Sequence, residues 1–340
     1  MKRIIVWLGI ICVFAAGGAG LWYVTHPKPE IQERLVVLET AREIAYLPHY
    51  VAAAKGYFRD ARLDVVLGTA PKGILSVEDA ERADIILTPF DRIIGSKAVA
   101  FAGLTATEPG LLVTREKTSP FAWTDISGKT VVGEHPEGTG QVAMEQILRS
   151  HEMISQWQYI SIQHLPTHLR LGTYLSGTGE FIIITDPEAS RLEKAGQGYI
   201  ASDLTAAGQM PSRVAATTSS KVSRNHEALI RYSAALARAQ VWIAQHSEEE
   251  VAVAASAFFP WVDYHTMVEM TGRAKETKLW APNPVIAPTS FDHLQDLMIQ
   301  AGELPQKIPF TKAVASDLAD QALRQIAEQD AEQDAEQKKE

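Results

Sequence analysis

Three polar segments of this sequence each follow a short strand-like run and precede a helical pattern: Thr88-Pro89, Gly138-Thr139-Gly140 and Thr185-Asp186. In the glycine-rich segment, Gly138 and Gly140 would let the backbone approach a ligand closely, and Thr139 offers a hydroxyl. The helix that follows would present unpaired N–H groups with a partial positive charge. This chemistry suits an anionic or strongly polar group. An ordinary strand-to-helix turn with Thr139 as the N-cap accounts for the same residues equally well.

Two other segments also have both a structural and a binding interpretation. Tyr46 and His49 lie in a loop after the first expected strand, where aromatic rings suit a planar ligand and a histidine can donate to an anion. The alternative for His49 is a hydrogen-bonded structural residue. Asp186 can cap a helix that begins at Pro187. Alternatively, Thr185 or Asp186 points from the strand end toward a ligand donor, and both roles are compatible.

Residues arranged for catalysis or metal binding are not evident. The only cysteine, Cys12, lies in the N-terminal apolar run, so the rest of the chain has no thiol nucleophile and no cysteine metal site. No serine lies in a Gly-x-Ser-x-Gly nucleophile elbow. His164 and His168 have the spacing of two ligands on one helical face, but Pro166 lies between them. We therefore expect no enzymatic activity, no metal and no cofactor.

The elements that must position these residues alternate between strands and helices. Strands are predicted at residues 34–39, 63–67, 84–88, 111–114, 130–134, 159–162, 181–185 and 213–217, and helices at 50–57, 141–151, 169–175 and 187–195. Such alternation predicts an α/β protein with largely parallel sheets, which bind ligands at the carboxyl ends of their strands. Only helices are predicted afterwards, at 225–245, 247–259, 263–272, 291–302 and 311–328. The last third is therefore expected to pack onto an existing sheet.

The length and charge of the chain limit its class. Its 340 residues, 46% of them hydrophobic, allow about two domains. The net charge is −9, and the body has no basic clusters, which argues against nucleic-acid binding. The repeat from Ala327 to Gln337 has no apolar face and is expected to form a frayed helix or a disordered tail.

The N-terminus predicts export. Two basic residues precede an apolar run from Ile4 to Val24, which at 21 residues is long enough to span a bilayer, and a polar linker follows. We expect residues 1–25 to be a retained signal anchor that holds the body on the extracytoplasmic face of a bacterial membrane. A signal peptide cleaved near residues 15–18, and lipidation at Cys12, are the alternatives.

Several short motifs occur in a recognisable order. Residues 50–65 read YVAAAKGYFRDARLDV, in which a helix ends with Lys-Gly-Tyr-Phe and a strand begins with Leu-Asp-Val. Further matching segments follow at 83–85, 126–133, 185–190, 239–242, 247–250, 258–260 and 280–284. Together these motifs resemble the solute-binding proteins of ABC importers of the nitrate/sulfonate/taurine and thiamine-precursor type, over about residues 35 to 325. Arg62 departs from the usual pattern, which has Gly there.

This resemblance implies the two-lobed periplasmic-binding-protein fold (type II), in which two α/β lobes joined by crossover strands close on the ligand. It implies a linker at 26–34, lobe one at 35–110 plus 213–325, lobe two at 114–208, and an acidic tail at 326–340. The ligand-facing positions that it implies are Tyr46, His49, Thr88, Pro89, Gly138, Thr139, Gly140, Thr185 and Asp186.

The function implied is that of an extracytoplasmic solute-binding protein, which captures a small polar or anionic ligand such as a sulfonate, nitrate, taurine or a pyrimidine. We expect it to act as a monomer with an ABC permease and its ATPase. A thiamine-pyrimidine-synthase-like enzyme on the same fold is one alternative, although such an enzyme needs histidine and cysteine groups together, and this body has no cysteine. A ligand-sensing module of a membrane signalling complex is the other.

Overall fold

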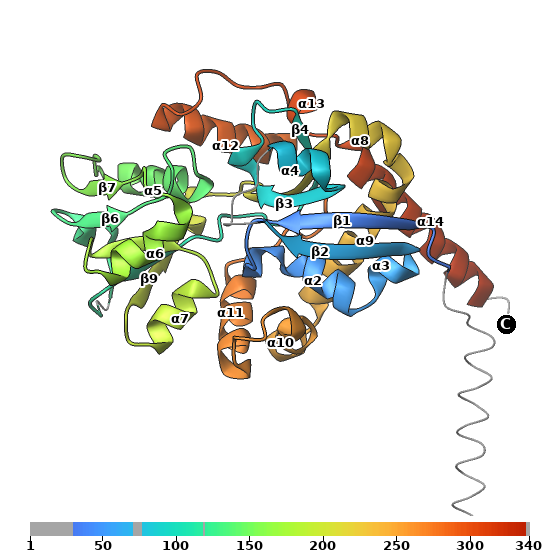
Figure 1. Cartoon of the computed structure of the whole chain (residues 1–340), viewed down its shortest axis with the longest axis horizontal. Coiled ribbons are helices and arrows are strands. Elements are labelled where there is room, and N and C mark those ends of the chain that lie inside the picture. Colours follow the sequence, from blue (N-terminus) through green and yellow to red (C-terminus); the bar gives the residue numbers. More distant parts are fainter. Residues whose placement is uncertain (1–29, 71–76, 118–119, 338–340) are drawn as a thin grey trace, which may run out of the picture.

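The fold is taken from a computed structural model, which describes residues 30–70, 77–117 and 120–337 (Figure 1). The expected anchor at residues 1–25, its alternative cleavage segment, and Cys12 lie outside the described residues. Within the described residues, no helix combines the length and the apolar character that crossing a bilayer requires.

Two five-stranded sheets form the framework. The first has the order β2-β1-β3-β10-β4 and the second the order β7-β6-β8-β5-β9. The strands of the first sheet are β1 (Glu33–Glu39), β2 (Leu63–Thr69), β3 (Ile85–Pro89), β4 (Ala98–Gly103) and β10 (Arg213–Thr218). Those of the second are β5 (Leu111–Thr114), β6 (Thr130–Val132), β7 (Ile160–Ile162), β8 (Phe181–Ile184) and β9 (Tyr199–Asp203). The chain passes to the second sheet after β4 and returns after β9, through residues 104–110 and 204–212.

Each sheet is mixed rather than largely parallel. In the first, β1 pairs in parallel with β2 and β3, whereas β10 runs antiparallel to β3 and β4. In the second, β6 pairs in parallel with β7 and β8, whereas β5 runs antiparallel to β8 and β9. The two-sheet α/β architecture is confirmed. The expectation of mainly parallel pairing is corrected, because each crossover leads into a strand, β5 or β10, that lies fourth of five in its sheet and runs antiparallel to both neighbours.

Helices cover both sheets, and the longest follow β10. The helices before β10 are α2 (Leu47–Ala54), α3 (Tyr57–Asp60), α4 (Val77–Arg82), α5 (Thr139–Ser150), α6 (Thr167–Leu175) and α7 (Glu188–Lys194). Those after it are α8 (Ser219–Arg224), α9 (His226–Gln245), α10 (Glu248–Ala255), α11 (Tyr264–Glu276), α12 (Pro288–Ala301), α13 (Phe310–Ala313) and α14 (Asp317–Gln337). As predicted, the last third adds helices to an existing sheet: α9 packs on α2, and α14 packs on α9 and β4. The repeat from Ala327 to Gln337 continues α14 as a helix.

One helix of the last third joins the two halves of the molecule. α12 packs against α5, and its Phe291 and Leu294 belong to one apolar cluster with Leu112 and Met144 of the second half. The His293 imidazole hydrogen-bonds to the carbonyl of Ala207 at 2.7 Å. Apolar contact therefore links the two sheets on the side of α12, whereas α11 lies on the opposite side of the gap between the sheets (Figure 1).

Candidate functional site

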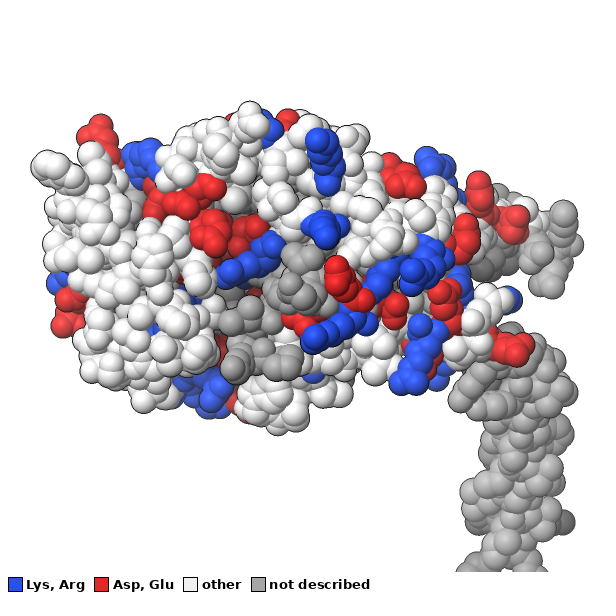
Figure 2. Space-filling view, turned by 45° about the horizontal axis from the view of Figure 1, so that its top comes forward, with Lys and Arg blue, Asp and Glu red and all other residues white. Residues whose placement is uncertain are grey.

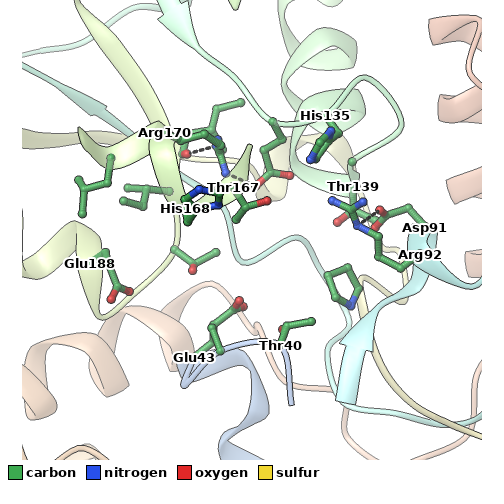
Figure 3. Close-up of a pocket in the computed structure, with 18 of the residues that line it drawn as sticks. Thr40, Glu43, Asp91, Arg92, His135, Thr139, Thr167, His168, Arg170 and Glu188 are labelled. Atoms are coloured by element: carbon green, nitrogen blue, oxygen red, sulfur yellow. Dashed lines mark hydrogen bonds and ion pairs between the residues drawn. The ribbon is translucent and has the colours of Figure 1, made fainter. Parts of the chain in front are cut away.

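A cavity of about 570 Å³ lies between the two sheets. Its walls come from loops that follow β1, β3, β6 and β8, from α6, and from the first residue of β10. The residues that line it are Thr40, Ala41, Glu43, Pro89, Asp91, Arg92, Glu134, His135, Gly138, Thr139, Thr167, His168, Arg170, Leu171, Ile182, Ile183, Ile184, Thr185, Glu188 and Arg213 (Figure 3). The carboxyl ends of parallel strands thus meet at this cavity, as in other open α/β sheets.

The structure brings four of the nine expected positions to this cavity. Pro89, Gly138, Thr139 and Thr185 line it. The other expected positions, Tyr46, His49, Thr88, Gly140 and Asp186, lie behind its walls, where most of them hold other residues in place.

Tyr46, which directly precedes α2, and His49, in the first turn of α2, are fully buried and do not line the cavity. The Tyr46 hydroxyl hydrogen-bonds to Thr40 Oγ1 at 2.9 Å, and Thr40 is a lining residue. His49 Nδ1 lies 2.8 Å from the Tyr232 hydroxyl, and its ring packs near Phe58. Burial lowers the pKa of His49 to about 3, so this imidazole is neutral. The structure thus places His49 as a hydrogen-bonded core residue.

Thr88 and Asp186 are also buried. Thr88 lies in β3, paired with Val214 of β10. Asp186 Oδ1 accepts from Ser190 N at 3.0 Å and from Ser190 Oγ at 2.7 Å, which caps α7. Its Oδ2 lies 3.2 Å from Arg273 Nε of α11. Asp186 therefore ties the second sheet's α7 to a helix packed on the first sheet.

The glycine-rich turn accommodates a side chain of this protein. Gly140 N donates to Glu134 Oε2 at 3.1 Å. A Cβ at Gly140 would lie only 2.7 Å from that oxygen, and one at Gly138 would lie 3.0 Å from it. These two glycines therefore let the Glu134 carboxylate approach the N-terminus of α5, where the sequence predicted a ligand anion.

Three arginines among the described lining residues were missed by the sequence analysis, and each has a carboxylate partner. Arg92 Nε lies 3.4 Å from Asp91 Oδ2, Arg170 Nη1 lies 3.5 Å from Glu134 Oε1, and Arg213 Nε lies 3.2 Å from Glu43 Oε2. Arg170 is further held by the carbonyls of Gly133 and Ile183. The sequence offered only a weak positional signal, because each arginine lies near the boundary of a predicted element: Arg92 follows a strand, Arg170 starts a helix and Arg213 starts a strand.

Arg213 joins the two crossover segments. Its Nη1 donates to Ser212 Oγ at 2.8 Å and to Thr139 Oγ1 at 3.2 Å, and it lies 3.9 Å from Glu108 Oε2. The Ser212 hydroxyl donates to Glu108. Burial disfavours the charge of Arg213, but the negative charges of Glu43 and Glu108 outweigh this effect and raise its pKa. Arg213 is therefore a cation on the cavity wall.

Burial also shifts the pKa values of carboxyl groups around the cavity. It raises the pKa of Asp91 to about 6 and that of Glu108 to about 7. Burial, followed by repulsion from Glu43, raises the pKa of Glu188. Burial and then Arg92 lower the pKa of His135. Acidic and basic side chains are also interspersed on the surface shown in Figure 2. Within the described residues, no cluster of metal-ligating side chains is present.

Comparisons with known proteins give the same picture of the fold. The family model described as "NMT1/THI5 like" matches residues 44–250. The protein named "Putative binding protein YtlA" from Bacillus subtilis (strain 168) is 28% identical over 304 residues, which cover 86% of this chain and 91% of that protein.

Two solved structures illustrate the likeness. The alkanesulfonate-binding protein SsuA from Xanthomonas axonopodis pv. citri, bound to MOPS, has a TM-score of 0.65 at 12% identity and covers 84% of this chain and 99% of its own. The periplasmic nitrate-binding protein NrtA from Synechocystis PCC 6803 has a TM-score of 0.66 at 14% identity, covering 87% of this chain and 89% of its own. At such identities the likeness shows a shared periplasmic-binding-protein fold.

Proposed function

Because this chain belongs to the NMT1/THI5-like family, we propose that it is the extracytoplasmic solute-binding component of an ABC importer. It captures a small polar ligand between two lobes and carries out no covalent chemistry. The observation that carries this proposal is the cavity of about 570 Å³, whose walls come from both sheets. Pockets for small molecules typically measure about 300–1,000 Å³.

The two lobes of the proposal are residues 35–110 plus 213–325, and residues 114–208. Closure of these lobes would enclose the ligand, and the permease would recognise the closed form. Thr139 and Thr185 are proposed to offer hydroxyls to the ligand, and Pro89, Leu171 and Ile184 an apolar surface. Because Thr139 is hydrogen-bonded to Ser212 and Arg213, a movement of Thr139 on closure would also displace the crossover segment that contains Ser212.

The proposed setting follows from the N-terminal sequence and from the relatives. Residues 1–25 would hold the protein at the outer face of the cytoplasmic membrane as a monomer, beside a permease and its ATPase. SsuA and NrtA, which share the fold, are named as binding proteins, which supports binding without turnover. Sulfonates, nitrate, taurine and pyrimidines are the ligands to be tried first.

A thermal-shift screen with these four classes tests the proposal. A ligand at 100 times its Kd should stabilise the protein by about 2.7 kcal/mol. Ala41 lines the cavity and is partly exposed there, so Ala41→Trp should fill the cavity and abolish the shift. Ala331→Trp, at an exposed position on α14, is the matched control and should keep it.

Two results would contradict the proposal. One is a ligand-induced shift that Ala41→Trp leaves unchanged, which would place binding outside the cavity. The other is release of a chemically altered ligand after prolonged incubation, as measured by mass spectrometry, which would indicate an enzyme.

A further inference from the structure

The positive charge in the cavity is already neutralised by the protein. Each of the three arginines among the described lining residues lies within 3.5 Å of a carboxylate oxygen, as given above. Arg213 has a second carboxylate, that of Glu108, at 3.9 Å. A ligand that offered only a negative charge would compete with these carboxylates for the same guanidinium groups.

The helix terminus that faces the cavity is occupied in the same way. Glu134 accepts from Gly140 N at the start of α5, and the glycines at 138 and 140 leave room for that carboxylate rather than for a larger group. A ligand anion at this terminus would lie beside the charge of Glu134. Carboxylates of the protein itself therefore already bind both features that could have attracted an oxyanion, namely the arginines and the N-terminus of α5.

Two carboxylates lie on one side of the cavity, one from each lobe, and the first of them, Glu43, has to share the single charge of Arg213 with Glu108. Glu43 comes from the loop after β1 and Glu188 from the start of α7, and Figure 3 shows them together on the side away from Asp91 and Arg92. The Glu188 side chain is 36% exposed and has Arg191 of its own helix as an ion-pair partner at 3.9 Å. Glu43 is near enough to raise the pKa of Glu188 by repulsion. Two acids of like charge thus face a space that a cation could fill.

An independent observation on the opposite wall points to the same kind of ligand. Asp91 is only 8% exposed and lines the cavity, yet its Oδ1 has no hydrogen-bond partner in the structure. A buried carboxylate oxygen without a donor costs free energy, and a ligand N–H could remove that cost. Among the described lining residues there is no lysine that could serve this oxygen instead.

We propose that the ligand carries a protonated amine or amidine, which binds between Glu43 and Glu188, and that further ligand donors are directed to Asp91. This inference rests on the proposed function and narrows its substrate class to nitrogenous cations and zwitterions. A cation held by one carboxylate of each lobe also favours the closed form, because it replaces a repulsion between the lobes by two attractions.

The test uses two pairs of probes, and in each pair only one member carries a protonated nitrogen. Taurine is compared with ethanesulfonate, and benzamidine with benzamide, by thermal shift and calorimetry at millimolar concentration; nitrate serves as a bare oxyanion. Each probe is applied to the wild-type protein, to Glu188→Gln and to Glu193→Gln. Glu193 is an exposed acid on the same helix, outside the cavity, and is the matched control.

We expect taurine or benzamidine to bind, its uncharged or amine-free partner not to bind, and Glu188→Gln to weaken binding at least tenfold. The Glu193→Gln variant should bind like the wild type. Equal binding by both members of each pair, undiminished binding by Glu188→Gln, or no binding of either cation overturns the inference.

The experiment also separates the two proposals. If nitrate or ethanesulfonate binds the wild type but not Ala41→Trp, the cavity binds solutes and only the inference about their charge fails. If no probe of either charge binds, the result counts against the proposed function as well.

Discussion

Removing the Asp186 carboxylate should destabilise the protein even before any ligand is added. The Asp186 side chain is only 3% exposed, and it both caps α7 and pairs with Arg273, whose side chain is 26% exposed. Breaking a fully buried ion pair costs about 3–5 kcal/mol, and partial exposure of the arginine reduces that cost. The lost cap adds about 1 kcal/mol. We expect Asp186→Ala to lower the free energy of unfolding by about 2–4 kcal/mol.

The measurement is thermal unfolding followed by circular dichroism. For a chain of this size, about 2–4 kcal/mol corresponds to a fall in Tm of roughly 5–10 °C. Asp186→Asn keeps an oxygen that can accept from Ser190 N but loses the charge. It should therefore lower the free energy of unfolding only by the contribution of the ion pair. Asp203→Ala is the control for local hydrogen bonds without an ion pair, because Asp203 Oδ1 accepts from Thr205 N at 2.9 Å and from the Thr205 hydroxyl, and it should cost about 1 kcal/mol.

A Tm for Asp186→Ala within a degree of the wild-type value would refute this reasoning. It would mean that the Asp186–Arg273 contact contributes nothing to stability, and that the carboxylate is available for another role such as ligand binding. An equal loss of unfolding free energy in Asp186→Ala and Asp203→Ala would assign the whole effect to local hydrogen bonds and none of it to the ion pair.

Three other substitutions or conditions test the site. Gly140→Ala places a Cβ 2.7 Å from the Glu134 carboxylate and should lower stability by about 1–3 kcal/mol in chemical denaturation, whereas Gly172→Ala, with nothing within 4 Å, should be neutral or stabilising. Glu108 has a folded-state pKa of about 7, above its usual 4.5, so the folded state binds more protons. Its contribution to the unfolding free energy should therefore fall as pH rises from about 4.5 to 7, and Glu108→Gln should flatten that profile. The pKa of Glu188 is raised to about 7, so calorimetric affinity for a cationic ligand should fall as pH decreases below 7, and Glu188→Gln should remove this dependence.

The sequence predicted most elements of the fold, because the buried strands and amphipathic helices carry clear apolar patterns. It missed the short helices α4 and α8 and, among the strands, β4 and β9; the two missed strands have a physical explanation. β4 reads AVAFAG, whose small residues lack a strong strand preference, and β9 reads YIASD, whose second half carries small and polar residues. Both strands also pair antiparallel with a neighbour in their sheet. A search for alternating strands and helices, which is typical of parallel pairing, therefore did not expect a strand at either position.

The candidate site was predictable in its location but not in its chemistry. Strand-end positions such as Pro89, Thr139 and Thr185 reach the cavity because the order of elements places them there. The pairing of Arg213 with Glu43 could not be read from the chain, since 170 residues separate them. Gly138 and Gly140 were correctly seen as a close backbone approach, but the approaching group is Glu134 from the same turn.

The two sides of the cleft differ in what their separation would expose. On one side α12 and α5 share an apolar cluster, and parting them would expose hydrophobic surface at about 25 cal/mol per Å². On the other side α7 meets α11 through Asp186–Arg273, Arg273–Ser190 and Lys194–Asp263. The Lys194–Asp263 pair is exposed and exchanges for water at about 0–1 kcal/mol, whereas both partners of the more buried Asp186–Arg273 pair would be hydrated on opening, which offsets part of the cost of separating them. We therefore expect the lobes to part on the side of α7, so that Glu188, which begins that helix, moves with the opening edge and separates from Glu43. A ligand cation that bridges Glu43 and Glu188 would therefore bind where the two lobes separate on opening, and it would stabilise the closed form directly.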